Sequence, residues 1–152
     1  MPINTEEQNR RRALLAAHYA AENDHDLERT MATFASGAEM IYNGQRFSDP
    51  DSIRWAHGYI GLTESPGAFS ELESIRDHEH ITADEIVVEG RLRGKHTGEF
   101  QGYAATGRDV VLPFVTFYRF DANGLLASER IVMNLGMLGS FGSAVESTNH
   151  SD

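Results

Sequence analysis

The feature that most constrains how this chain folds is a change of periodicity at Pro66-Gly67. Before this point, apolar residues recur at helical spacing, in segments that begin with side chains able to cap a helix. After it, β-type runs follow one another at residues 69–80, 85–96, 110–120 and 125–134. Helices first and an antiparallel sheet afterwards predict one α+β domain.

The first two helices are predicted from their capping residues. The spacing of Thr5 and Gln8 is typical of a capping box and predicts a helix over residues 6–23. Asp26 can cap a second, short helix, because the apolar residues after it recur at helical spacing as far as Phe34.

A short strand and a third helix complete the first half. Residues 38–43 predict a strand that ends in a tight turn at Asn43-Gly44. Asp49-Pro50 then offers a capping carboxylate followed by proline at the first helical position, which predicts a helix to about residue 62. Its inward stripe is expected to be Ile53, Ala56, His57 and Ile60.

The run at residues 110–120 is apolar on both faces. Leu112, Phe114, Thr116 and Tyr118 form one face, and Val111, Pro113, Val115 and Phe117 form the other. A strand that is apolar on both sides is covered on both sides. Three helices can cover only one face of a curved sheet, so we expect a homodimer in which the outer sheet face is the subunit interface.

Charge and cysteine content narrow the classes of partner and chemistry. The 152 residues carry 13 basic and 23 acidic side chains, a formal net charge of −10, which disfavours nucleic acid and anionic lipid as partners. No cysteine is present, so disulfides, thiolate zinc sites and cysteine nucleophiles are excluded. We expect a cytoplasmic protein with one domain over residues 1–142 and a polar tail over 143–152.

Two segments resemble a known family. Gly94-Lys95-His96-Thr97-Gly98-Glu99-Phe100-Gln101-Gly102, followed by Thr106-Gly107-Arg108, resembles a hairpin of the SnoaL-like polyketide cyclases, and residues 124–135 resemble their last strand. That family belongs to the nuclear-transport-factor-2-like superfamily. The resemblance implies a cone-shaped α+β barrel, with three N-terminal helices packed on a strongly bent antiparallel sheet around one pocket. It also implies cofactor-free chemistry on a small hydrophobic molecule.

The resemblance also points to a departure on the last strand. The cyclases place an aspartate, as general acid/base, at the position matched to Asn134, and a histidine at the position matched to Val132. An amide can orient a carbonyl group but cannot accept a proton at neutral pH. We therefore expect Asn134 and Tyr118 to hold the substrate oxygen, and another group to carry the proton.

His57 is the candidate for that proton carrier, because its ordinary pKa is near neutral and it lies on the inward stripe of the third helix. The alternative is a core histidine satisfied by a backbone carbonyl. The residues expected to line the substrate pocket are His18, Tyr19, Tyr42, Trp55, Tyr59, His96, Phe114, Thr116 and Val132. Structural roles remain open for His18, His96 and Tyr42.

No metal site is predicted. His78-Glu79-His80 places two imidazoles on one side of a strand, but no third ligand is marked by the sequence.

Three functions stay open from the sequence alone. The first is an enzyme that performs acid/base chemistry on a hydrophobic ketone, lactone or polyketide-like compound, by cyclisation, isomerisation, dehydration or hydrolysis. The second is a non-catalytic protein that binds such a compound. The third is a module that binds a protein partner.

Overall fold

The computed structural model describes residues 4–139. In chain order the elements are α1 (Thr5–Asn23), α2 (Leu27–Met31), β1 (Phe34–Tyr42), β2 (Gln45–Phe47), α3 (Pro50–Ile60), β3 (Phe69–Ile81), β4 (Glu85–His96), β5 (Asp109–Phe120), β6 (Leu126–Met133) and a short 3₁₀ helix, η1 (Gly136–Leu138). The domain limit at residue 142 and the tail at 143–152, both predicted above, lie outside the described residues.

Each of the three α-helices begins at a capping side chain. Asn4, not Thr5, caps α1, and its side-chain oxygen accepts a hydrogen bond from the backbone N–H of Glu7 at 2.7 Å. Asp26 caps α2, and Asp49 forms a capping box with Ser52 at the start of α3. The helical periodicity predicted to extend to Phe34 ends earlier, because the chain enters β1 at that residue.

The six strands form one sheet in the order β2-β1-β6-β5-β4-β3. The pairing of β1 with β6 is parallel, whereas an antiparallel sheet was expected from the order of the elements. Sequence analysis also missed β2. It pairs with β1 through the predicted turn at Asn43-Gly44, where φ angles of 45° and 86° suit asparagine and glycine.

The sheet bends strongly, and two features allow the bend. The pairing of β3 with β4 shifts register twice, which increases local twist. Gly90 lies opposite Phe114 in β5, and a Cβ atom there would lie 2.3 Å from the carbonyl oxygen of Ile75 and 2.6 Å from Cζ of Phe114. Only glycine leaves room for this close approach, which lets the Phe114 ring lie flat along the inner face of the sheet.

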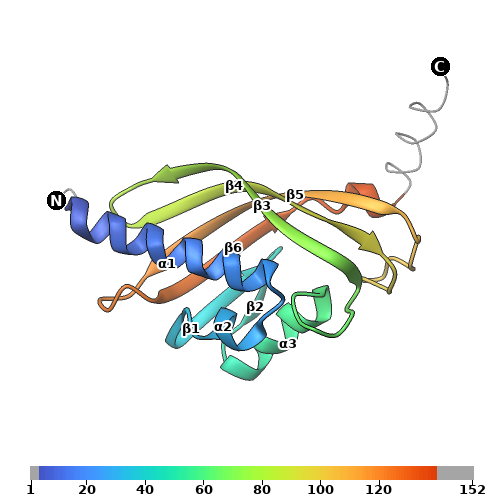
Figure 1. Cartoon of the computed structure of the whole chain (residues 1–152), viewed down its shortest axis with the longest axis horizontal. Coiled ribbons are helices and arrows are strands. Elements are labelled where there is room, and N and C mark those ends of the chain that lie inside the picture. The colour runs from blue at the N-terminus through green and yellow to red at the C-terminus, as the bar shows by residue number, and fades with distance from the viewer. Residues whose placement is uncertain (1–3, 140–152) are drawn as a thin grey trace, which may run out of the picture.

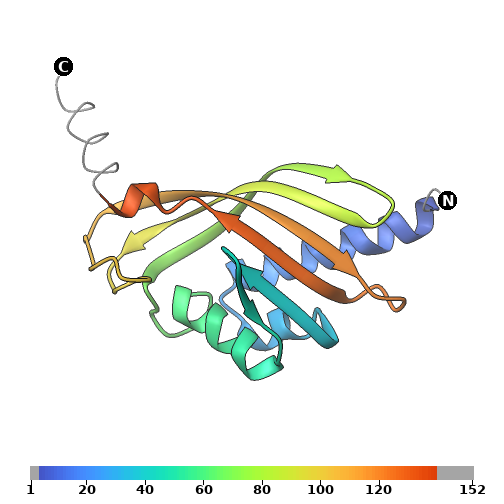
Figure 2. The same cartoon turned by 180° about the vertical axis from the view of Figure 1, so that it is seen from behind.

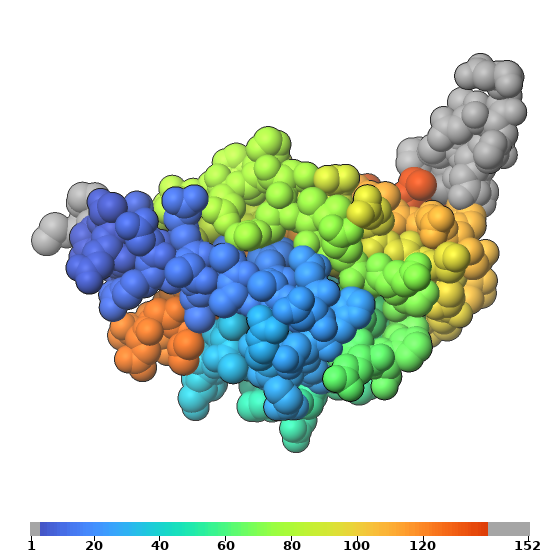
Figure 3. Space-filling view, viewed as in Figure 1, coloured from blue at the N-terminus to red at the C-terminus, as the bar shows by residue number. Residues whose placement is uncertain are grey.

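The long strands arch over a lower group formed by α2, α3, β1 and β2, and α1 runs along the front (Figures 1 and 2). In the space-filling view, α1 and α2 form the surface at the centre of the molecule (Figure 3). This arrangement confirms the predicted fold class: three helices packed on a strongly bent, six-stranded sheet. Within residues 4–139, no helix combines the length and the apolar character needed to cross a membrane.

The two faces of β5 are unequal in burial. Leu112, Phe114, Thr116 and Tyr118 are buried on the inner face, as the sequence predicts. On the outer face, Val111, Val115 and Phe117 are half-buried and Pro113 is exposed. The helices therefore cover the inner face alone, and the apolar outer face is left partly exposed in a single chain.

Candidate active site

A cavity of about 220 Å³ lies between the helices and the inner face of the sheet. Its wall combines α1, β1, β2, α3 and the inner faces of β3 to β6. The aromatic and apolar lining residues include Met40, Tyr42, Phe47, Trp55, Tyr59, Ile60, Leu92, Phe100, Phe114, Ile131 and Met133. Such a lining suits a small hydrophobic ligand.

Exposed lining residues mark the mouth of the cavity. Trp55 is 58% exposed and stacks on Tyr59, with ring centroids 5.0 Å apart and planes 7° apart. Tyr59 stacks in turn on Phe100 at 5.4 Å, and Phe47 lies 6.4 Å from Trp55 on the other side. These stacked rings form an aromatic row where a ligand would enter.

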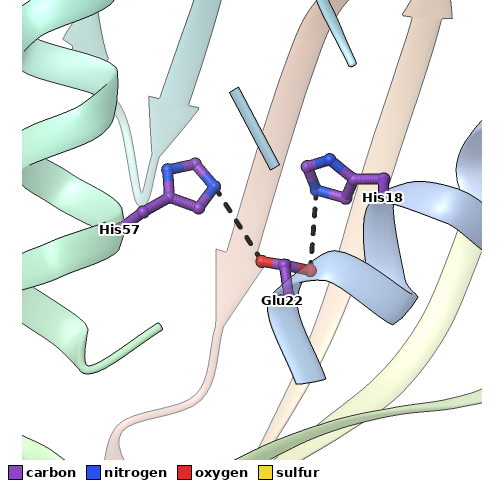
Figure 4. A group of neighbouring side chains, drawn as sticks. All are labelled: His18, Glu22 and His57. Atoms are coloured by element: carbon purple, nitrogen blue, oxygen red, sulfur yellow. Dashed lines mark ion pairs between the residues drawn. The ribbon is translucent and has the colours of Figure 1, made fainter. Parts of the chain in front are cut away.

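The opposite end of the cavity is polar, buried and acidic. Glu22 from α1, His57 from α3 and Glu129 from β6 all reach it, and each is less than a tenth exposed. His18, one helical turn before Glu22, lies directly behind and is fully buried. Figure 4 shows His18 and His57 pointing toward the two oxygens of Glu22 from opposite sides.

The imidazole nitrogens of this cluster lie close to its carboxyl oxygens. His18 Nε2 lies 3.5 Å from Glu22 Oε1, and His57 Nε2 lies 3.9 Å from Glu22 Oε2. Glu129 Oε2 lies 3.9 Å from both Nε2 atoms. Four titratable groups thus converge on one point at the base of the cavity.

The hydrogen bonds of the two Nδ1 atoms fix how both imidazoles present themselves. His57 Nδ1–H donates to the carbonyl oxygen of Ile53 at 2.8 Å. His18 Nδ1–H donates to Thr33 Oγ1 at 2.8 Å, since the Thr33 hydroxyl gives its own proton to the carbonyl oxygen of Thr30 at 2.6 Å. In the neutral rings, each Nε2 therefore directs a lone pair toward the carboxyl groups.

Burial controls the charge of this cluster. It lowers the pKa of His18 to about 3, with a smaller contribution from the nearby charge of His57, and it lowers the pKa of His57. It raises the pKa of Glu129 to about 8, and it raises the pKa of Glu22 well above its ordinary value, with Glu129 adding repulsion. The four groups are therefore mostly uncharged at neutral pH, with protons held on the carboxyl groups.

Two tyrosines stand beside the carboxyl groups. The hydroxyls of Tyr19 and Tyr118 lie 2.7 Å apart in a buried hydrogen bond. Burial raises the pKa of both phenols well above the ordinary value, so both remain protonated donors. Only one of the two protons is used in the bond between them, which leaves the other available to an acceptor such as a ligand oxygen.

Most of the predicted pocket residues meet in this cavity. Those that line it are Tyr19, Tyr42, Trp55, His57, Tyr59, Phe114, Thr116 and Tyr118. The bond from His57 to a backbone carbonyl, weighed above as a structural alternative, also exists, but it uses Nδ1 alone. His18 contacts the cluster from behind and is absent from the wall itself.

Three predicted residues lie elsewhere. Val132 is 54% exposed and Asn134 is exposed, and neither lines the cavity. Successive residues of a strand point to opposite faces, and the inward positions near the end of β6 are Glu129, Ile131 and Met133. Asn134 and Val132 were therefore wrongly placed in the pocket, because both lie outside the inward-facing positions.

Asn134 and His96 instead support local structure. The side-chain oxygen of Asn134 accepts a hydrogen bond from the backbone N–H of Gly136 at 2.8 Å, which shapes the entry to η1. His96 is fully buried, stacks on Phe69 at 5.2 Å and contacts Thr106 Oγ1 through Nδ1 at 3.1 Å. The placement of His96 in the pocket was wrong, and its role is to hold the hairpin.

Glu22 and Glu129 are the site residues that sequence reasoning missed. Glu22 follows His18 by four residues on one helix, so the two side chains share a face. Glu129 alternates with Ile131 and Met133, which places a carboxyl group on an otherwise apolar strand face. Both signals were present in the sequence, but each needed the correct face assignment to be recognised.

The fold and cavity define a cone-shaped α+β protein of the nuclear-transport-factor-2-like class. Residues 15–129 match the SnoaL-like domain. Because this match spans more than half of the chain, the chain belongs to the family of SnoaL-like domains. No curated protein sequence matches it.

Solved structures show the same fold at low sequence identity. A putative polyketide cyclase from Xanthomonas campestris has a TM-score of 0.73 at 18% identity, covering 85% of this chain and 93% of that chain. A putative SnoaL-like polyketide cyclase from Jannaschia gives 0.71 at 20%, covering 100% and 96%. AclR, a putative hydroxylase from Streptomyces galilaeus, gives 0.70 at 23%, covering 88% and 96%. Identities this low establish the fold alone.

Proposed function

We propose that this protein is an enzyme that moves protons on a small hydrophobic carbonyl compound bound in the cavity. The observation that carries the proposal is the convergence of His57, Glu22 and Glu129 at the closed end of an apolar, aromatic cavity. Buried titratable groups collected in one cavity are typical of acid/base sites. Isomerisation, dehydration and aldol-type cyclisation can begin with such a transfer, whereas hydrolysis would use the same groups to activate water.

The proposed first step is enolisation. The neutral Nε2 of His57 takes a proton from the carbon next to the carbonyl group, so the C–H bond breaks and a C=C bond forms. The carbonyl oxygen receives the proton of the Glu129 carboxyl group, which yields an enol. The resulting imidazolium and carboxylate are a pair only 3.9 Å apart, so the proton can return and restore both groups.

The tyrosine pair supplies the remaining stabilisation in this mechanism. The spare phenolic proton of Tyr19 or Tyr118 donates to the oxygen that gains negative charge. A preorganised donor of this kind contributes about 3–4 kcal/mol in known active sites. Asn134, exposed on the outer side of the last strand, has no part in this step.

The alternative, a non-catalytic binding protein, was motivated by the absence of a carboxylate on the last strand. Glu129 removes that motive, because it places a carboxyl group on the inward face of β6. The same cavity would serve a binding protein, so turnover decides between the two functions.

Deuterium exchange tests the proposal without knowledge of the natural substrate. A panel of ketones (cyclohexanone, 1-tetralone and 2-tetralone) is incubated with the protein in D₂O, and loss of the α-proton signal is followed by NMR. His57→Asn keeps a donor for the Ile53 carbonyl but removes Nε2. We therefore expect the acceleration of α-proton exchange by the protein to fall about 100-fold or more. His80→Gln, an exposed histidine paired with Glu89, is the control. Equal rates in both variants, or no acceleration by wild type, would refute the assignment.

We also propose the expected homodimer, formed through the outer sheet face. The half-buried Val111, Val115 and Phe117 and the exposed Val132 support it, because they leave an apolar patch on one side of a single chain. Sedimentation analysis should give twice the chain mass for wild type and the chain mass for Val115→Glu; a monomeric wild type would contradict it. The cytoplasmic location stays a prediction.

A further inference from the structure

The arrangement of His18, Glu22 and His57 has a geometry that proton transfer alone does not require. His18 and Glu22 lie one turn apart on α1, and His57 approaches from α3 (Figure 4). One ligand atom from each of these three buried side chains lies within 4.8 Å of the other two. Two imidazole nitrogens and a carboxylate oxygen are thus gathered around one point.

The second observation is an unpartnered nitrogen. His18 Nε2 is completely buried and makes no hydrogen bond within the described part of the chain. Glu129 Oε2, 3.9 Å away, is also buried without a hydrogen-bond partner there. A buried polar atom without a hydrogen-bond partner destabilises the folded chain. Two such atoms directed at the same point indicate that a ligand normally completes the cluster.

The Nδ1 atoms of both imidazoles, which point away from the cluster, are held by hydrogen bonds as they are in metal sites. A metal-bound histidine usually donates its other N–H to a backbone carbonyl, a carboxylate or another acceptor, which fixes the ring and frees the opposite nitrogen. His57 does so through the carbonyl oxygen of Ile53, and His18 does so through Thr33 Oγ1. Both Nε2 atoms are therefore oriented for coordination before any ion arrives.

We propose that His18 Nε2, His57 Nε2 and a carboxylate oxygen of Glu22 bind one divalent transition-metal ion of the zinc type at the base of the cavity. Two histidines and one glutamate are a known catalytic zinc set, in which the fourth position stays open. That position faces the cavity, since Glu22 and His57 line it. Glu129 stands beside the site, with Oε2 3.9 Å from both Nε2 atoms, and is outside the proposed ligand set.

The observed spacing is close to what such an ion needs. Tetrahedral coordination with bonds of 2.0–2.1 Å places neighbouring ligand atoms about 3.3–3.4 Å apart. His18 Nε2 lies 3.5 Å from Glu22 Oε1, and His57 Nε2 lies 3.9 Å from the other oxygen, Oε2. The three ligand atoms lie within 4.8 Å of one another, so an ion would draw them together by up to about 1.4 Å along an edge. Binding would release the protons that the Glu22 and Glu129 carboxyl groups hold in the metal-free cluster, and the resulting carboxylates match a divalent cation.

The inference uses the same cavity as the proposed function, but it does not depend on turnover. An ion at this point would occupy the lone pair of His57 Nε2, so the acid/base step proposed above belongs to the metal-free protein. Exchange measured in the presence of a chelator tests the proposed acid/base function, whereas metal binding measured without substrate tests this inference. Either can fail while the other holds.

Calorimetric titration of chelator-treated, dialysed protein with Zn²⁺ tests the site directly. We expect one equivalent to bind, and Co²⁺ to give the visible absorption of a four-coordinate ion that Zn²⁺ displaces. His18→Asn keeps a donor for Thr33 but removes Nε2, so affinity should fall more than 100-fold. Thr33→Val removes only the outer hydrogen bond of His18, and affinity should fall about 10- to 100-fold.

His80→Gln is the control for ions held by exposed histidines, and it should leave the affinity unchanged. Circular dichroism establishes that each variant is folded. If His18→Asn does not fold, the wild-type stoichiometry and the Co²⁺ spectrum still decide. No binding to wild type, an octahedral Co²⁺ spectrum, or equal affinity in wild type and Thr33→Val would overturn the proposal.

Discussion

Replacing Glu129 by glutamine should make the protein more stable at alkaline pH. Burial raises the pKa of this carboxyl group from 4.5 to about 8, so the folded chain holds a proton that the unfolded chain releases. An acid whose pKa is raised by folding contributes full stability below pH 4.5, and that contribution is lost as the pH rises toward 8. Glutamine has nearly the same shape and does not titrate.

The magnitude follows from the two pKa values. Each pH unit between them costs the wild type about 1.4 kcal/mol of unfolding free energy. Between pH 5 and pH 8 the stability of Glu129→Gln relative to wild type should therefore rise by about 3–4 kcal/mol. Glu22 titrates in both proteins, but charged Glu129 raises the pKa of Glu22 in the wild type alone, so Glu22 adds to the difference with the same sign.

Urea unfolding at pH 5 and pH 8, with chelator present to keep ions from the carboxyl group, measures this difference. Met133→Leu is the control, because it changes a neighbouring lining residue that does not titrate. Its stability relative to wild type should be the same at both pH values. If the unfolding free energy of Glu129→Gln relative to wild type is also the same at both pH values, burial does not hold this carboxyl group protonated. The account of the cluster would then fail.

Three further predictions test the packing around the cavity. Gly90→Ala should destabilise the protein by about 1–3 kcal/mol in urea unfolding, because the new Cβ meets Ile75 and Phe114. Its control, Gly58→Ala in α3, has space for the Cβ and should stabilise by about 0.5–1 kcal/mol. Equal changes in stability would contradict the close approach at Gly90. Tyr118→Phe should lower the unfolding free energy by about 1–3 kcal/mol, because it leaves the Tyr19 hydroxyl unpaired. The double variant Tyr19→Phe/Tyr118→Phe should lose less stability than the two single variants added together. Simple additivity would show that the hydroxyls do not interact. The chain has a single tryptophan, at the cavity mouth, so 2-tetralone should quench its fluorescence with saturation, and strictly linear quenching would argue against binding there.

The fold was predictable because its signals are local. The capping carboxylate at Asp49, the turn at Asn43-Gly44 and the division of β5 into two faces depend on neighbouring residues, and all three are confirmed. The parallel pairing of β1 with β6 was missed, because it joins segments about 90 residues apart and leaves no local pattern. The three-residue strand β2 is too short to show a period.

The site was predictable only in part, for a related reason. His57 was found because a helical stripe fixes its direction, and Tyr118 because β5 alternates without interruption. On the last strand, the resemblance matched Asn134 and Val132 to pocket residues, but the alternation along β6 turns Val132 outward and Glu129, Ile131 and Met133 inward. Glu129 was missed because no face was assigned to this strand from its own alternation.

The most direct test of the central claim compares these two residues in the deuterium-exchange assay. If the reaction centre is the buried cluster, Glu129→Gln should lower the acceleration of exchange at least about 100-fold, and Asn134→Ala should leave it within about two-fold of wild type. Loss of exchange in Asn134→Ala with full activity in Glu129→Gln would place the chemistry on the other face of the last strand and contradict the account.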